Sequence, residues 1–279
     1  MNKNKKMLSP KIDVVFKMLF GEQKHERITK KLIEDVIEEK VETIELEQTP
    51  YLWGNQADDK LGIIDVRATI NGKNPIDIEM QILDNHDIEK RILFYWSKLY
   101  LKQIDRGDDY NKLNRSISII FLDYEIEKLK QLPIHTKWQI RNDKNGKTIL
   151  TEDLEIPKIN RMLENGKLKK WILFLENPEG EETKRMAEKE KEIKEAIETL
   201  EDISSDEAKE RIAELRQKYI MDTKSQLRTA EEKGLKKGLE EGIKSGKKEI
   251  AKKMLQKNIA LETIIEITGL TEEEIEKIN

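Results

Sequence analysis

Two carboxylates and one amide have the types and spacing needed for metal-assisted chemistry. Asp65 lies in one segment of alternating apolar residues, and Glu79 and Gln81 lie in the next. If the segments pair as strands, Asp65 is directly or diagonally opposite Glu79 on a polar face. A divalent cation with oxygen ligands relieves the repulsion between such carboxylates, and magnesium there could activate water and stabilise a phosphodiester's developing charge. Gln81 could orient a water or a phosphate oxygen. A solvated hairpin face with acidic side chains fits the spacing equally well.

The strands that must position these residues are predicted at 61–70 and 76–83, separated by the hairpin signal Asn71-Gly72. The apolar residues of both strands occupy even-numbered positions. Both sets can face one core only if an even-numbered residue of one strand pairs with an even-numbered residue of the other. A two-residue turn at Asn71-Gly72 would instead pair even-numbered residues with odd-numbered ones. We therefore predict a three-residue loop, either 70–72 or 71–73.

The surrounding pattern predicts a mixed α/β core. Apolar residues at helical spacing predict helices at about 11–21, 26–39 and 87–104. A short alternating strand is expected at 43–48 and a buried one at 116–122. Helix, three strands, helix and strand in this order are typical of a mixed sheet flanked by helices.

Composition excludes several classes of site. The 279 residues can bury a sizeable core, and 39 % of them are charged with a net charge of only -4. Cysteine is absent, which excludes disulfides, thiol nucleophiles and cysteine-bound metals, and the three histidines show no ligand spacing. No phosphate-binding glycine motif is present, so no nucleotide cofactor is expected. Without a long apolar segment, we expect a cytoplasmic protein with no membrane contact.

Three segments carry a family resemblance. SPKIDVVFKMLFG, then GIIDVRA with IDIEMQ, and then RILFYWSKLYLKQIDRGDDY resemble the recombination-promoting nuclease (Rpn) family, a transposase-like branch of the PD-(D/E)XK nuclease superfamily. The resemblance covers roughly residues 8–178. It implies a restriction-endonuclease-like fold, magnesium-dependent DNA endonuclease activity with manganese as a substitute, and a role in recombination or mobile elements.

The resemblance also implies roles for individual residues. Asp65, Glu79 and Gln81 fall on the catalytic positions, with Asp65 and Glu79 holding the metal. Glutamine replaces the superfamily's lysine but matches the ExQ form of this family. Because glutamine has no positive charge, either metal ions or another basic residue must stabilise more of the developing charge.

Arg91, Tyr95 and Lys98, with Lys102, share one stripe of the helix predicted at 87–104. Beside the hairpin, this stripe could hold DNA phosphates, and Arg91 is the best candidate. The alternative is an ordinary amphipathic helix with solvated lysines, which we prefer for Lys98 and Lys102.

Sites of this superfamily often include one more acidic residue from the first helices. The sequence offers Asp13, in the first family-like segment, and Glu34, in the second helix. We prefer Asp13. Its alternative role is compensation of the helix dipole, because an aspartate stabilises the first turn of a helix in any case.

The chain changes character after about residue 178. Only one of 15 aromatic residues lies beyond position 180, where 25 acidic and 21 basic residues fall among 99. We predict a nuclease-like domain at 1–178, a charged helical linker and oligomerisation segment at 179–257, and a small helix-turn-helix-like element at 258–279. Within the linker, nine lysines against three glutamates at 233–257 could contact DNA or form a solvated face.

Glycines recur every four residues in the linker, at Gly234, Gly238, Gly242 and Gly246. Because glycine disfavours helix, the repeat indicates either close helix contact or a hinge. The second helix of the terminal element is acidic, which argues against its reading a DNA groove and favours self-association. The expected partners are therefore DNA and further copies of the chain.

Two other functions remain open. A catalytically silent DNA-binding or regulatory relative would keep the fold and fail to cleave DNA, although the intact Asp65, Glu79 and Gln81 count against it. A helical self-assembly protein with a nuclease-like adaptor would show no metal dependence and would oligomerise through its tail.

Overall fold

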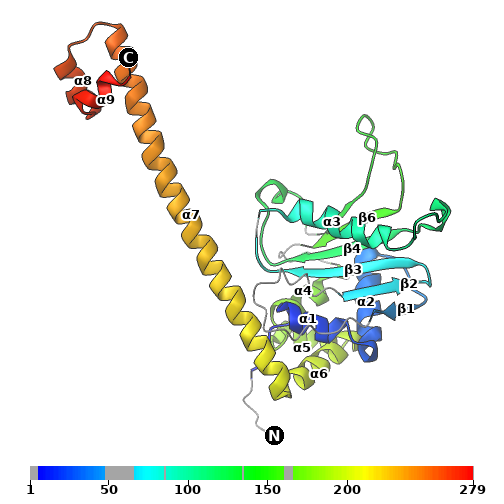
Figure 1. Cartoon of the computed structure of the whole chain (residues 1–279). Coiled ribbons are helices and arrows are strands. Elements are labelled where there is room, and N and C mark those ends of the chain that lie inside the picture. Colours follow the sequence, from blue (N-terminus) through cyan, green and yellow to red (C-terminus); the bar gives the residue numbers. More distant parts are fainter. Residues whose placement is uncertain (1–5, 48–65, 85, 134, 160–165, 279) are drawn as a thin grey trace. The chain divides into compact units, whose positions relative to one another are not determined.

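The computed structural model describes residues 6–47, 66–84, 86–133, 135–159 and 166–278. The chain forms two compact units, Met1–Ile220 and Met221–Asn279. Figure 1 shows the helices and strands and labels most of them. They are α1 (Asp13–Phe20), α2 (Glu26–Ile37), β1 (Ile44–Leu46), β2 (Val66–Ile70), β3 (Asn74–Gln81), α3 (Ile88–Leu101), β4 (Ser116–Leu122), β5 (His135–Trp138), β6 (Leu154–Ile159), α4 (Lys169–Glu176), α5 (Glu181–Ala187), α6 (Lys191–Ser205), α7 (Glu207–Gln256), α8 (Leu261–Thr268) and α9 (Glu272–Glu276).

The described strands form a six-stranded mixed sheet in the order β1-β2-β3-β4-β6-β5. β1, β2 and β3 are antiparallel neighbours, β3, β4 and β6 run parallel, and β5 pairs antiparallel with β6. The predicted mixed α/β fold with flanking helices and a long C-terminal helix is confirmed. Because β3 and β4 are parallel, the chain must cross over between them, and α3 forms this crossover.

The register of the β2–β3 hairpin follows the parity argument. Val66 pairs with Ile78 and Ile70 with Asn74, which leaves a three-residue loop at 71–73. Asn71 and Gly72 both have left-handed backbone angles, with φ of 52° and 68°. Asparagine and glycine tolerate this conformation best, and the turn closes with the Lys73 N–H donating to the Ile70 carbonyl.

Helices cover both faces of the sheet (Figure 1). The even-numbered apolar residues of β2 and β3 enter the main core with α1, α2, α4 and α6. The opposite face is covered by α3, where Ile88 packs with Ile120 and Leu122 of β4. The indole N–H of Trp96 fixes α3 to this face by donating to the Ser116 carbonyl at 2.9 Å.

The core continues beyond the predicted boundary near residue 178. Ile193, Ala196, Leu200 and Ile203 of α6 are buried in the main cluster, as is Ala213 of α7. These α6 positions follow the three-and-four spacing of one helix face, so a narrow apolar stripe packs on the core although the helix is highly charged. The division at residue 178 stays a prediction.

The second unit contains a small core at the end of the chain. Four residues are buried together, namely Ala251 of α7, Ile264 of α8, Ile275 of α9, and Leu270 from the turn between α8 and α9. Gly269 ends α8 with φ of 63°, and the Thr271 hydroxyl accepts from the Glu274 N–H in a capping box that begins α9. Within the element expected at 258–279, α8 and α9 therefore form two helices joined by a short turn at Gly269 and Leu270.

No helix within the described ranges has an apolar stretch long and uncharged enough to cross a membrane.

Candidate active site

Glu79 and Gln81 lie at the carboxyl end of β3, on the sheet face opposite the main core. The Glu79 side chain is only 3 % exposed, and the Gln81 amide donates to Glu79 Oε2 at 3.1 Å. The alternative interpretation, a solvated hairpin face, does not hold at this position, because the polar face is buried. Asp65 lies outside the described residues. The next residue, Val66, pairs with Ile78, the neighbour of Glu79.

Asp77 is a second buried carboxylate on this face, and we did not single it out from the sequence. It is 2 % exposed, two residues before Glu79, and faces Arg67 across the β2–β3 pair, with Arg67 Nε 4.0 Å from Asp77 Oδ1. Burial raises the pKa of Asp77 well above its usual range, the negative charge of Glu79 raises it further, and Arg67 lowers it in part. The alternation placed Asp77 beside Glu79 in the sequence but did not reveal its burial.

The donor set of this face fits a divalent cation with oxygen ligands. Ser118 of β4 is in register with Asp77, and among the described residues Asp77 Oδ1 and Ser118 Oγ have no hydrogen-bond partner. Buried oxygens in this state are costly unless a cation or water satisfies them. No group of three or more histidine, aspartate or glutamate side chains that could hold a metal occurs in the described ranges. A complete site would need a further ligand, the role predicted for Asp65.

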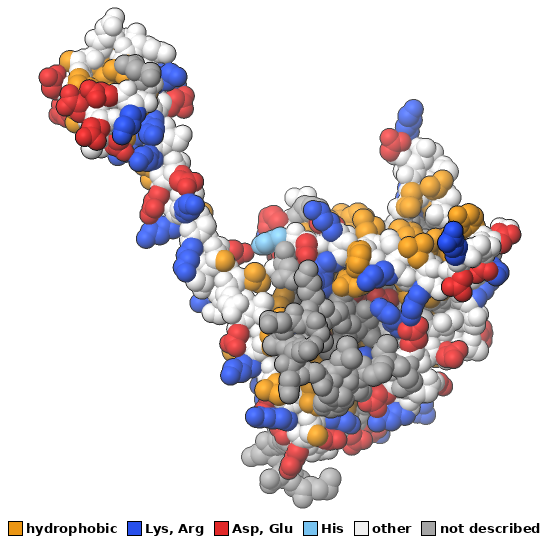
Figure 2. Space-filling model, in the orientation of Figure 1, with side chains coloured by type: hydrophobic (Ala, Val, Ile, Leu, Met, Phe, Trp, Pro, Cys, Tyr) orange, Lys and Arg blue, Asp and Glu red, His pale blue; other side chains and the backbone are white. Residues whose placement is uncertain are grey.

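Arg91, Tyr95 and Lys98 come together on α3. Arg91 Cζ lies 5.8 Å from the centre of the Tyr95 ring, and Lys98 Nζ lies 4.5 Å from that of Phe94. The Phe94 side chain is 54 % exposed, and Figure 2 shows apolar and basic side chains interspersed over this helix. Such a surface combines positive charge with aromatic faces, two features that nucleic-acid strands bind. The DNA-binding role of the three residues stays a prediction.

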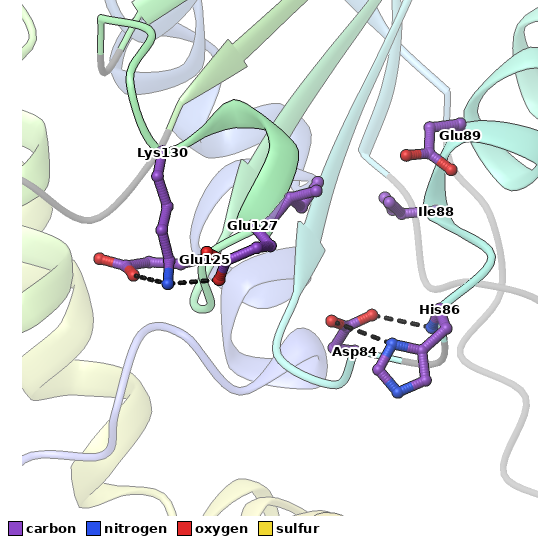
Figure 3. Close-up of a pocket in the computed structure, with 8 residues that line it drawn as sticks. Asp84, His86, Ile88, Glu89, Glu125, Glu127 and Lys130 are labelled. Carbon is purple, nitrogen blue, oxygen red and sulfur yellow. Dashed lines mark hydrogen bonds and ion pairs between the residues drawn. The ribbon is translucent and has the colours of Figure 1, made fainter.

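A pocket of about 620 Å³ lies where β3 and β4 end (Figure 3). Its lining follows the two parallel strands and includes Asp84, His86 and Glu89 after β3, and Glu125 and Lys130 after β4. His86 Nδ1 is 3.5 Å from Asp84 Oδ2, and Lys130 Nζ is 3.9 Å from Glu125 Oε2. Ligands in open α/β sheets often bind beyond the carboxyl ends of parallel strands. The sequence signal for this pocket was the run of acidic residues that follows each of the two strands, and we did not use it.

Arg216 of α7 holds the carboxylate of Asp13, the other predicted catalytic residue. Arg216 Nε lies 2.9 Å from Oδ1 and 2.8 Å from Oδ2, and the Val14 N–H also donates to Oδ1. Glu34, the alternative candidate, accepts the Val41 N–H at 3.1 Å and closes the turn after α2. Both carboxylates make structural contacts, and the catalytic role of Asp13 stays a prediction.

Comparison with known proteins gives two matches to family models. A model described as PD-(D/E)XK nuclease family transposase matches residues 10–230. A second, described as Rpn/YhgA-like nuclease family, C-terminal HTH domain, matches residues 244–279. No curated protein and no solved structure matched the chain.

Proposed function

The chain belongs to the PD-(D/E)XK nuclease family of transposases, and from that premise we propose that it is a divalent-metal-dependent DNA endonuclease acting in recombination or at mobile elements. The observation that carries the proposal is the buried polar face of β3. There Glu79 and Gln81 form a hydrogen-bonded ExQ pair inside the region matched to the family.

Each residue has a distinct role in the proposed reaction. Glu79, with Asp65 as the predicted second ligand, would hold Mg²⁺, for which Mn²⁺ can substitute. When bound, the metal supplies a polarised phosphate oxygen and an acidified water. Gln81 fixes the Glu79 carboxylate through its amide and leaves its own carbonyl oxygen to accept from a water.

The chain's own positive charge would complete the site. Arg67 faces the acidic strand, so it reduces the repulsion among the carboxylates while the metal is absent. Arg91 is the residue we propose to bind a DNA phosphate from α3, where its guanidinium carbon lies 5.8 Å from the centre of the Tyr95 ring. Self-association through the C-terminal helices and a cytoplasmic location stay predictions from the sequence.

Nicking of supercoiled plasmid by the full chain tests the proposal. We expect cleavage with Mg²⁺ or Mn²⁺, no cleavage with a chelator, and loss of cleavage in Asp65→Ala with the circular dichroism spectrum unchanged. Arg91→Ala should weaken DNA binding while the domain stays folded. Cleavage that continues in Asp65→Ala or with the chelator would overturn the proposal, and a wild-type chain that binds DNA without cutting it would indicate the silent relative.

A further inference from the structure

A phenylalanine ring is exposed on α3 between two lysines. Phe94 is 54 % exposed, although the same helix buries Ile88 and Leu99 against the sheet side. Lys90 and Lys98 lie four residues before and four residues after Phe94, so the three side chains share one ridge of the helix. Both lysines are exposed, and neither forms an ion pair with another residue in the described part of the chain. The ridge therefore presents an aromatic ring flanked by two positive charges.

Neighbouring side chains hold the Phe94 ring in place. The centre of the Tyr95 ring lies 5.3 Å from that of Phe94, and the two planes are inclined by 79°, an edge-to-face arrangement. Lys98 Nζ lies 4.5 Å from the centre of the Phe94 ring, within the range of a cation–π contact. Because these contacts orient the ring while Phe94 stays exposed, a planar group can stack on it without a rearrangement of α3.

We propose that Phe94 is a stacking platform for an unpaired DNA base, with Lys90 and Lys98 holding phosphates on either side. The proposal rests on the DNA-binding part of the proposed function and specifies the substrate as DNA with an unpaired segment. The faces of a base inside a duplex are covered by neighbouring base pairs, whereas an unpaired base can present one face to an aromatic ring. Since an α-helix rises by about 1.5 Å per residue, each lysine lies about 6 Å along the helix axis from Phe94.

The charges of α3 favour a nucleic-acid strand over a protein as the occupant of this surface. The helix carries three basic residues and one acidic residue, Glu89, which lies in its first turn. A DNA strand neutralises the lysines with its phosphates and releases bound counterions. A protein that covered the exposed apolar residues Leu93 and Leu101 would need acidic side chains to do the same. We therefore assign the surface to DNA and make a protein partner an outcome of the test.

Fluorescence anisotropy of the full chain tests the platform, with a labelled oligothymidine and a labelled duplex of the same length in a chelator that prevents cleavage. We expect the wild type to bind the single strand more tightly than the duplex. Phe94→Ala should weaken binding of the single strand by about 5- to 100-fold, because the stacking of one base is lost, and should leave duplex binding nearly unchanged. Phe94→Trp keeps a ring that can stack and should bind the single strand at least as tightly as the wild type.

Leu93→Ala is the matched control, because Leu93 is 52 % exposed on the same helix and has no aromatic face. This variant should bind both DNAs as the wild type does, and circular dichroism will verify that all variants stay folded. Three results would overturn the proposal: a wild type that prefers the duplex, Phe94→Ala that binds the single strand normally, or Leu93→Ala that weakens binding equally. The last result would indicate an apolar surface for a protein partner.

The binding test and the plasmid-nicking test fail independently, because binding is measured without metal. If the chain binds single strands through Phe94 and never nicks plasmid, only the nuclease proposal fails. If nicking depends on Asp65 and Phe94→Ala binds single strands as the wild type does, only the stacking platform fails.

Discussion

Replacing Asp77 by asparagine should stabilise the protein, although most substitutions of buried residues destabilise it. Asp77 is buried with Glu79 on one face of β3, and burial and the Glu79 charge both raise its pKa. Asparagine has nearly the same shape and no charge, and its amide group can donate to the Glu79 carboxylate. The substitution therefore removes a repulsion and keeps the packing.

The geometry of the strand gives the size of the effect. Two residues along a strand separate side chains on one face by about 6.6 Å, and two unit charges at that distance repel by about 2.5 kcal/mol at an effective dielectric constant of about 20. Arg67, 4.0 Å from Asp77, offsets part of this repulsion. We expect Asp77→Asn to raise the free energy of unfolding by about 1–2 kcal/mol at pH 8, a rise in Tm of roughly 2–8 °C.

The stability gained by Asp77→Asn should increase as the pH rises. In the unfolded chain Asp77 loses its proton near the ordinary pKa of about 3.9, whereas in the folded protein its raised pKa keeps the proton to higher pH. The stability of the wild type therefore falls as the pH rises from about 3.9 to the raised pKa of the folded state. This one-proton difference contributes about 1.4 kcal/mol per pH unit, and asparagine removes it. Urea unfolding at pH 5 and pH 8 measures the difference. An equal effect at both pH values, or a less stable variant at pH 8, would show that the Asp77 charge does not destabilise the folded protein. Glu45→Gln, at an exposed position, is the control.

Two further predictions concern the scaffold. Asp35→Ala should lower the free energy of unfolding by about 3–5 kcal/mol, because Asp35 is 2 % exposed, accepts the Trp171 indole N–H at 2.9 Å and lies 3.0 Å from Lys170 Nζ. The control Glu190→Ala, which removes the more exposed partner of Lys170, should lower the free energy of unfolding by less than about 1 kcal/mol, and thermal unfolding of both variants measures the difference. Thr271→Ala removes the capping box of α9 and should destabilise this helix by about 1 kcal/mol. Amide exchange should be faster than in the wild type within the second unit and unchanged within the first.

Residue spacing was enough to predict the hairpin and the length of its loop, and it left two registers open. The even-numbered apolar residues of β2 and β3 could face one core only with an odd loop, and the loop at 71–73 has three residues. The strand at 116–122 and the helices predicted at 11–21, 26–39 and 87–104 correspond to β4, α1, α2 and α3, because long periodic segments carry the clearest pattern. β5, β6 and α4 were not predicted as separate elements.

The burial of the site could not be predicted from the same pattern. Alternation assigns Asp77 and Glu79 to one side of β3, but their burial depends on how α3 packs over the sheet and how β4 pairs beside β3, and the alternation does not show either. The contribution of α6 was missed for a related reason. Its apolar residues form one narrow stripe, and the high average charge of the tail obscured it.

We propose that DNA cleavage requires the carboxylate of Glu79 and that the fold does not depend on it. Glu79→Gln changes the charge with little change in shape, and the amide of Gln81 can still donate to the new side chain. We predict that the variant nicks supercoiled plasmid with Mg²⁺ at least about 100-fold more slowly than the wild type, equivalent to about 2.7 kcal/mol of lost transition-state stabilisation. Its unfolding transition should stay cooperative, and exposed Glu45→Gln should cleave at the wild-type rate. Cleavage by Glu79→Gln at the wild-type rate would show that this carboxylate has no part in the reaction.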